Sequence, residues 1–127
     1  MKLRIKGNSL RLRVSRSEVA KLLKRERLEE TIHFGTQASA KFTYALEQAS
    51  SIDVPNVRYT RNKVTVLIPA DQANTWCATD QVGIVDSLSI GSFGSLDLLI
   101  EKDFACLDQS DEDNEDTFAN PSAGSTC

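Results

Sequence analysis

Apolar and charged residues alternate along the first fourteen residues of the chain, MKLRIKGNSLRLRV, on both sides of a Gly7-Asn8 pair. Alternation with a period of two is typical of a β-strand, and a Gly-Asn pair between two alternating runs predicts a β-hairpin. A turn at Gly7-Asn8 sets Leu3 opposite Leu12 and Arg4 opposite Arg11. One face of this hairpin is then apolar. The other face carries Lys2, Arg4, Lys6, Arg11 and Arg13.

A helix is predicted directly after the hairpin. Ser15 and Glu18 have the spacing of a capping box, in which each side chain bonds the backbone N–H of the other residue. The apolar stripe that follows consists of Val19, Leu22 and Leu23. We expect this helix to end near Arg25 or Arg27. Two more alternating runs, at residues 28–34 and 41–47, predict a third and a fourth strand.

The same order of elements begins again when the sequence is shifted by 54 residues. Leu3 then falls on Val57, Leu12 on Val66, and Leu28 on Val82, with no gap from residue 3 to residue 47. This indicates two pseudo-repeats, at about 1–50 and 54–104, each with the order strand–strand–helix–strand–strand.

Neither repeat is long enough for an independent core, so we expect a single duplicated α+β domain over residues 1–107. It contains about eight mostly antiparallel strands and two short helices. Closure removes exposed strand edges and therefore favours a barrel or half-barrel, although two separate layers are an alternative. Residues 108–127 are acidic and poor in apolar side chains, which predicts a flexible C-terminal tail.

Charge is distributed unevenly along the chain, although the formal net charge is only −3. Residues 1–27 carry ten Lys or Arg and two Glu, a net charge of +8. The other hundred residues carry five Lys or Arg and sixteen Asp or Glu, a net charge of −11. The basic hairpin face therefore has three interpretations: internal pairing with acids of neighbouring strands or the tail, binding of phosphate groups, or docking of a protein partner. Nucleic acid is disfavoured because no aromatic residue interleaves with the basic positions to stack a base.

Candidate chemistry is sparse. Three scattered cysteines and one histidine predict neither a disulfide framework nor a metal site, and we expect no cofactor and no catalytic residue. Cys106 is interpreted as a buried structural cysteine. Glu47 and Glu101 occupy equivalent positions of the two repeats, where they are either an acid/base pair in a barrel lumen or partners of Arg and Lys on adjacent strands. No apolar run is long enough to span a membrane, and the N-terminus does not read as a signal peptide, which favours a cytoplasmic protein without a membrane partner.

Three segments of the chain carry a resemblance: the opening KLRIKGNSLRLR, the segment 101–107 (EKDFACL), and the acidic stretch that closes on 118–121 (FANP). Together they resemble a family of small bacterial proteins of unknown function. A looser likeness is to the triphosphate-tunnel barrels, whose first strand reads Glu-x-Glu-x-Lys. The first strand here reads Lys2-x-Arg4-x-Lys6, without the acid pair that would hold a metal, which argues against that activity.

The sequence therefore favours a non-enzymatic binding or interaction module that uses the basic N-terminal hairpin face, with a protein or a phosphorylated small molecule as its partner. The alternative is a phosphate-ligand-binding barrel, or a small hydrolase acting on phosphorylated compounds. The expected anion contacts are Lys2, Arg4, Lys6, Arg11, Arg13 and Arg58.

Overall fold

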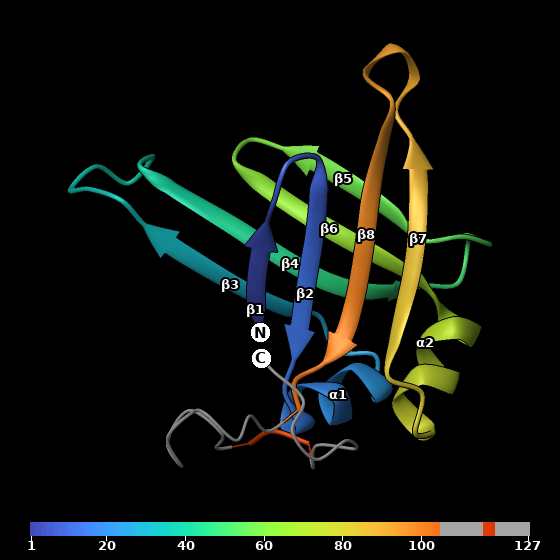
Figure 1. Cartoon of the computed structure of the whole chain (residues 1–127). Coiled ribbons are helices and arrows are strands. Elements are labelled where there is room, and N and C mark those ends of the chain that lie inside the picture. Colours follow the sequence, from blue (N-terminus) through green and yellow to red (C-terminus); the bar gives the residue numbers. More distant parts are fainter. Residues whose placement is uncertain (105–115, 119–127) are drawn as a thin grey trace.

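The structure is a computed structural model that describes residues 1–104 and 116–118. Two α-helices and eight strands form the described chain (Figure 1). In chain order they are β1 (Lys2–Ile5), β2 (Ser9–Val14), α1 (Arg16–Leu23), β3 (Leu28–His33), β4 (Lys41–Ala49), β5 (Asn56–Thr60), β6 (Lys63–Pro69), α2 (Ala70–Ala78), β7 (Gly83–Ser89) and β8 (Ser95–Lys102), with a 3-10 turn, η1 (Gly91–Phe93), between the last two strands.

The strands form two four-stranded mixed sheets, with the orders β1-β2-β8-β7 and β3-β4-β6-β5. Each sheet joins two antiparallel hairpins through one parallel pair, β2 with β8 and β4 with β6. The expected α+β class is confirmed. The expected barrel is wrong, because β1, β7, β3 and β5 are the edges of two separate sheets and do not pair with one another. The two layers that the sequence left as the alternative are the observed arrangement.

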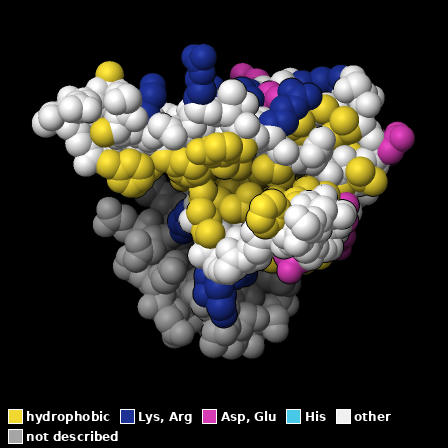
Figure 2. Space-filling view, turned by 90° about the horizontal axis from the view of Figure 1, so that it is seen from above, with side chains coloured by type: hydrophobic (Ala, Val, Ile, Leu, Met, Phe, Trp, Pro, Cys, Tyr) yellow, Lys and Arg dark blue, Asp and Glu magenta, His cyan; other side chains and the backbone are white. Residues whose placement is uncertain are grey.

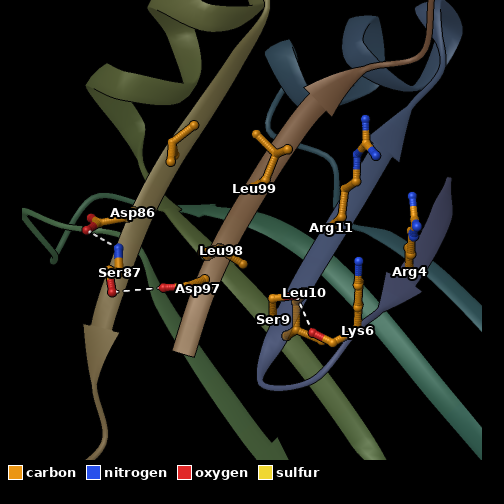
Figure 3. Close-up of a pocket in the computed structure, with 11 residues that line it drawn as sticks. Arg4, Lys6, Ser9, Leu10, Arg11, Asp86, Ser87, Asp97, Leu98 and Leu99 are labelled. Atoms are coloured by element: carbon orange, nitrogen blue, oxygen red, sulfur yellow. Dashed lines mark hydrogen bonds between the residues drawn. The ribbon is translucent and has the colours of Figure 1, made fainter. Parts of the chain in front are cut away.

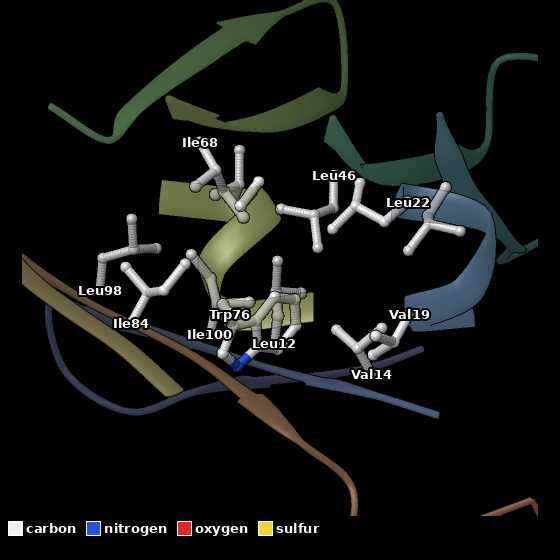
Figure 4. Packing of buried hydrophobic residues seen from close by; sticks show 13 residues of the cluster. Leu12, Val14, Val19, Leu22, Leu46, Ile68, Trp76, Ile84, Leu98 and Ile100 are labelled. Atoms are coloured by element: carbon white, nitrogen blue, oxygen red, sulfur yellow. The ribbon is translucent and has the colours of Figure 1, made fainter. Parts of the chain in front are cut away.

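The helices explain why the sheets do not close. Both α1 and α2 lie at one end of the molecule (Figure 1). Their buried side chains, among them Leu22 and Trp76, belong to the same apolar cluster as the strand residues Leu46 and Ile100 (Figure 4). Trp76 is fully buried and its indole N–H donates to the Val82 carbonyl at 3.1 Å. The helices thus fill the space between the sheets at this end, while the four hairpin turns point away from it.

The N-terminal elements form as the sequence predicts. In the β1–β2 hairpin, Leu3 pairs with Leu12 and Arg4 pairs with Arg11, and Gly7 takes the positive φ of 55° that the tight turn requires. The Ser15–Glu18 capping box is present. Helix α1 ends at Leu23, earlier than expected, because Arg25 adopts a left-handed conformation with a φ of 66° that the helix cannot continue through.

The two parallel pairs have the same register after a shift of 54 residues. Ser9 pairs with Asp97 in the first sheet, and the positions 54 residues away, Lys63 and Thr43, pair in the second. The third strands do not follow this shift. Leu28 pairs with Leu46 whereas Ile84 pairs with Ile100, so Ile84 and not Val82 occupies the position equivalent to Leu28. The expectation of a gapless alignment through this strand is therefore wrong, and descent of the two halves from one unit stays a prediction.

A short C-terminal segment, residues 116–118, packs against the helix end of the domain. The Arg16 amide donates to the Asp116 carbonyl at 3.1 Å, and both the amide and the hydroxyl of Ser17 donate to the Asp116 carboxylate. These bonds, the Ser17 hydroxyl first, hold the pKa of Asp116 below its ordinary value. The Phe118 ring lies 5.8 Å from that of Phe104. Most of the predicted tail, and Cys106, lie outside the described residues, so the tail's flexibility stays a prediction.

Candidate functional site

The basic face of the opening hairpin is the outer face of the first sheet. Alternation along β2 sends Leu12 and Val14 into the core, where they are almost fully buried. Arg11 and Arg13 therefore lie on the opposite side, together with the basic residues of β1. The arginines thus do not line an interior lumen, which the barrel interpretation required.

Strand β8 places one carboxylate beside both arginines of β2. Glu101 is the register partner of Arg13, and its Oε1 accepts from Arg11 Nε at 2.6 Å and from Arg13 Nε at 2.9 Å. Its side chain is only 14% exposed. At the end of the same face, the Lys2 ammonium lies 3.1 Å from the Asp103 carboxylate. Internal pairing, one of the three interpretations of the basic face, therefore accounts for Lys2, Arg11 and Arg13.

Arg4 and Lys6 differ from these three residues in having no acidic partner in the described part of the chain. Both side chains are exposed, and neither forms an ion pair with a carboxylate of residues 1–104 or 116–118. They border a cavity of about 500 Å³ on the outer face of the first sheet (Figure 3). Figure 3 shows Arg4, Lys6 and Arg11 projecting from the same side of the sheet. Two cations without a described counter-charge therefore lie at the margin of a concave surface.

The cavity is built from rows of residues that cross all four strands of the sheet. The central row runs from Arg4 to Arg11, then to Leu99 and Val85, each the register partner of the one before. This row is cationic at β1 and β2 and apolar at β8 and β7. Val85 is 78% exposed, so the apolar half is open to solvent. We call these four residues the amphipathic row.

A polar row borders the amphipathic row on the side of the β1–β2 turn. Ser9 pairs with Asp97 and Asp97 pairs with Ser87, and the Ser87 hydroxyl donates to the Asp97 carboxylate at 3.0 Å. The Ser9 hydroxyl donates to the Lys6 carbonyl at 2.6 Å. These bonds leave the carboxylates charged. Asp97 and Asp86, which also lines the cavity, form no ion pair with a cation of the described residues, so the cavity has two unpaired cations at the β1–β2 hairpin and two unpaired carboxylates at β7 and β8.

Arg58 is not brought to this site. It lies on β5 in the second sheet, opposite Thr65. The sequence grouped it with the hairpin residues because of its position in the second repeat. The apolar members Leu99 and Val85 were missed altogether, because only the parallel pairing of β2 with β8 brings them next to the arginines. No local signal in the sequence specifies that pairing.

The other candidate groups have structural partners. Glu47 does not meet Glu101; its carboxylate accepts from Arg27 at 2.9 Å on the second sheet. The Met1 ammonium lies 2.6 Å from Glu18. Burial raises the pKa of Glu18, but the bonds from that ammonium and from Ser15 outweigh it, so the pKa is lower than the ordinary value. Burial raises the pKa of the Cys77 thiol, opposed by the charge of Lys102.

Among the described residues, no group of His, Cys, Asp and Glu side chains is placed to hold a metal ion. The helices in the same part of the chain are also too short and too polar for any of them to cross a membrane.

The fold and this site define a small α+β protein of two mixed sheets, with an amphipathic cavity on the outer face of one of them. The chain belongs to the DUF7009 family, a family of unknown function whose model matches residues 1–122. The resemblance that the sequence carries to a family of unknown function is thereby confirmed. No curated protein and no solved structure matches the chain.

Proposed function

We propose that this protein is a binding module that holds an amphipathic anion on the outer face of its first sheet. The ligand has an anionic group, a carboxylate, sulfonate or phosphate, at Arg4 and Lys6, and an apolar body over Leu99 and Val85. The observation that carries this proposal is the amphipathic row, in which the unpaired Arg4 and an exposed apolar surface lie on either side of Arg11 within one cavity. Charge-assisted bonds to arginine orient the anion, and burial of the apolar body supplies affinity.

Binding without catalysis is favoured by the groups that the cavity lacks. A serine hydroxyl needs a neighbouring general base to act as a nucleophile. The Ser87 hydroxyl donates to the Asp97 carboxylate and the Ser87 amide to the Asp86 carboxylate, and the single histidine of the chain, His33, lies on β3 in the other sheet. Phosphorylated compounds remain within the proposed ligand class, as ligands of an open surface and not of a barrel interior.

The proposal is tested by fluorescence titration with 8-anilinonaphthalene-1-sulfonate, a sulfonate on an aromatic body, followed by competition with decanoate, decyl phosphate, decanol and inorganic phosphate. We expect the two amphipathic anions to displace the dye and decanol and inorganic phosphate to do so poorly. Arg4→Ala should weaken binding by about tenfold, the loss of one charge-assisted contact.

Arg58→Ala is the matched control, because it removes an exposed arginine from the equivalent edge strand of the second sheet, outside the cavity. Equal affinities of the Arg4→Ala and Arg58→Ala variants would overturn the proposal, as would displacement by decanol as strong as by decanoate. Whichever of decanoate and decyl phosphate displaces the dye at the lower concentration indicates whether the site prefers a carboxylate or a phosphate.

We also propose that the two halves of the domain are pseudo-repeats. The common shift of 54 residues between the β2–β8 and β4–β6 registers supports this, since both the pairing and the position along the strands are then preserved. Each sheet takes one hairpin from each half. The halves therefore form a single folding unit under this proposal, and residues 1–50 expressed alone should show no cooperative unfolding in urea.

A further inference from the structure

The four hairpin turns all lie at the end of the molecule away from the helices and are spread across its width (Figure 1). They comprise residues 6–8, 34–40, 61–62 and 90–94. None of these residues, and none of the strand residues on either side of them, is Asp or Glu. The same stretches contain Lys6, Lys41, Arg61 and Lys63. We call this part of the molecule the open end.

Large apolar side chains project from the open end. Phe93 in the β7–β8 turn is 87% exposed and Phe34 in the β3–β4 turn is 68% exposed. Tyr59 and Ile5, beside the other two turns, are 66% and 62% exposed. Figure 2, which looks down on this end, shows hydrophobic side chains across the space between the sheets, with Lys and Arg side chains and some Asp and Glu side chains at its edges. Apolar surface gathered in this way marks an interaction site.

The chemistry of this surface selects its partner. Aromatic side chains favour the interface between lipid headgroups and acyl chains, and Lys and Arg beside them are attracted to anionic lipids. Carboxylates, which anionic headgroups would repel, are missing from the turns. Phe34 and Phe93 stand on hairpins of different sheets. A bilayer surface, which deforms around them, accepts such separated tips without shape complementarity.

We propose that the open end docks on an anionic lipid surface, with Phe34 and Phe93 inserted among the headgroups and Lys6, Lys41 and Arg61 facing their phosphates. Lys63 contributes less, because its ammonium lies 3.3 Å from the Glu29 carboxylate. The sequence favoured no membrane partner, but that expectation considered only segments long enough to span a bilayer. Docking through turns needs no such segment. Lys6 also borders the cavity on the outer face, so the variants below change other residues of the open end and test docking separately from the cavity.

Sedimentation with vesicles tests the proposal on the full chain. Vesicles of phosphatidylcholine mixed with phosphatidylglycerol should pull down the protein, and vesicles of phosphatidylcholine alone should not. The double variant Lys41→Glu/Arg61→Glu should lower the partition coefficient by at least about tenfold, because each basic residue near an anionic surface contributes on the order of 1 kcal/mol. The control Lys21→Glu/Lys24→Glu makes the same change of net charge at the C-terminal end of α1, where Lys24 is the C-cap, and should retain binding.

Insertion is tested separately with Phe34→Ser/Phe93→Ser. These side chains are exposed, so folding should be unaffected while binding to the mixed vesicles falls. Val54→Ser is the control, since Val54 is 59% exposed but lies in the β4–β5 loop. In a Phe93→Trp variant, the added indole should shift its emission to the blue on mixed vesicles, against the constant signal of the fully buried Trp76.

Three outcomes would overturn the proposal. The first is absence of binding to either vesicle, and the second is equal binding to both compositions. The third is binding that the tip variants and their controls affect alike. Concentration-dependent self-association that the Phe34→Ser/Phe93→Ser variant abolishes, without vesicle binding, would assign the open end to a second copy of the chain instead.

Discussion

The outer faces of the two sheets have the same strand pairing but carry different side chains. In the first sheet the β2 positions hold Arg11 and Arg13, and the cavity beside them is open. In the second sheet the equivalent β6 positions hold Thr65 and Leu67, which are 8% and 2% exposed. Arg27 donates to Glu47 at 2.9 Å and to Thr65 at 3.2 Å across that face. One face is thus closed by its own side chains, while the other leaves Arg4, Lys6 and Val85 available.

This difference separates what the scaffold requires from what a ligand would use. The inward-facing positions are apolar in both sheets, and both sheets have a glutamate at the same place on the central strand, Glu47 and Glu101. The second outer face has an unpaired arginine of its own, Arg58, but its register partner there is the polar Thr65. Unpaired cations together with exposed apolar residues occur on the first outer face only. A binding role is therefore better sought there than in features common to both halves. The five predictions that follow test this division, from the largest expected effect to the smallest.

Leu46 and Ile100 occupy equivalent positions of the two sheets and are both fully buried. Leu46→Ala and Ile100→Ala should each lower the free energy of unfolding by about 3 kcal/mol, because each removes buried methylene groups and leaves a cavity. Urea denaturation monitored by circular dichroism measures both values. A large loss for one variant and a negligible loss for the other would contradict the structural equivalence of the two inner faces.

Glu101→Gln should destabilise the protein by about 2 kcal/mol, because it removes the one carboxylate, only 14% exposed, that lies between two partly buried arginines and leaves them beside each other without a counter-charge. Glu47→Gln should cost less than about 1 kcal/mol, since the Glu47 side chain is 30% exposed and its pair with Arg27 is screened by solvent. Urea denaturation at low and at high salt measures the loss of stability of each variant, and we expect the smaller, solvent-screened loss for Glu47→Gln. Equal losses would indicate that the two outer faces are electrostatically alike.

The helix N-termini provide a third contrast. Glu18→Gln should lower stability by about 1 kcal/mol, because glutamine can still accept from the Ser15 amide in the capping box but loses the charge that pairs with the Met1 ammonium and with the helix N-terminus. Asp71→Asn in the first turn of α2 should have little effect, since that helix begins at Pro69 without a side-chain cap. Thermal unfolding of both variants beside the unmodified protein measures the difference.

The lowered pKa of Glu18 makes its contribution depend on pH. A carboxylate with a depressed pKa in the folded state stabilises the protein above its unfolded-state pKa, and this stabilisation is lost as the pH falls through the folded-state value. The Glu18→Gln variant and the unmodified protein should therefore converge in stability in acid. A difference that is constant down to low pH would contradict this assignment.

The smallest effects on stability are expected at the edge strands. Arg4→Ala and Arg58→Ala should each change the free energy of unfolding by less than about 0.5 kcal/mol, because both side chains are exposed and neither has a described ion-pair partner. The two variants should nevertheless differ in their affinity for 8-anilinonaphthalene-1-sulfonate, which only Arg4→Ala should weaken. A large loss of stability for Arg4→Ala would indicate a structural role instead of a ligand contact.

Local signals in the sequence predicted the local structure well. The Gly7-Asn8 turn fixed the register of β1 with β2, since a two-residue turn leaves only one pairing. The Ser15–Glu18 box located the start of α1. The five basic residues of the hairpin were correctly placed on one face, because alternation along a strand decides the face of every side chain.

The candidate site was predicted only in part. Arg4, Lys6 and Arg11 border the cavity, but Arg58 lies on another sheet, and the apolar half of the site was missed. In the sequence, Leu99 and Val85 are ordinary apolar residues of predicted strands, and nothing near them indicates a site. Their meeting with Arg11 depends on β8 entering beside β2, a contact between residues about ninety positions apart, as for the Arg11–Glu101 bond.

The sequence by itself determined the strands, the helices, the first hairpin and the charge of its outer face, because turn residues and hydrophobic periodicity act over a few residues. Only the tertiary structure decided that the sheets stay separate, that Glu101 pairs with both Arg11 and Arg13, and that Arg4 borders the same cavity as an exposed apolar surface. Those outcomes follow from which strands become neighbours. That choice is made by packing around Trp76 and the rest of the core, where residues from both halves of the chain must fit together at once.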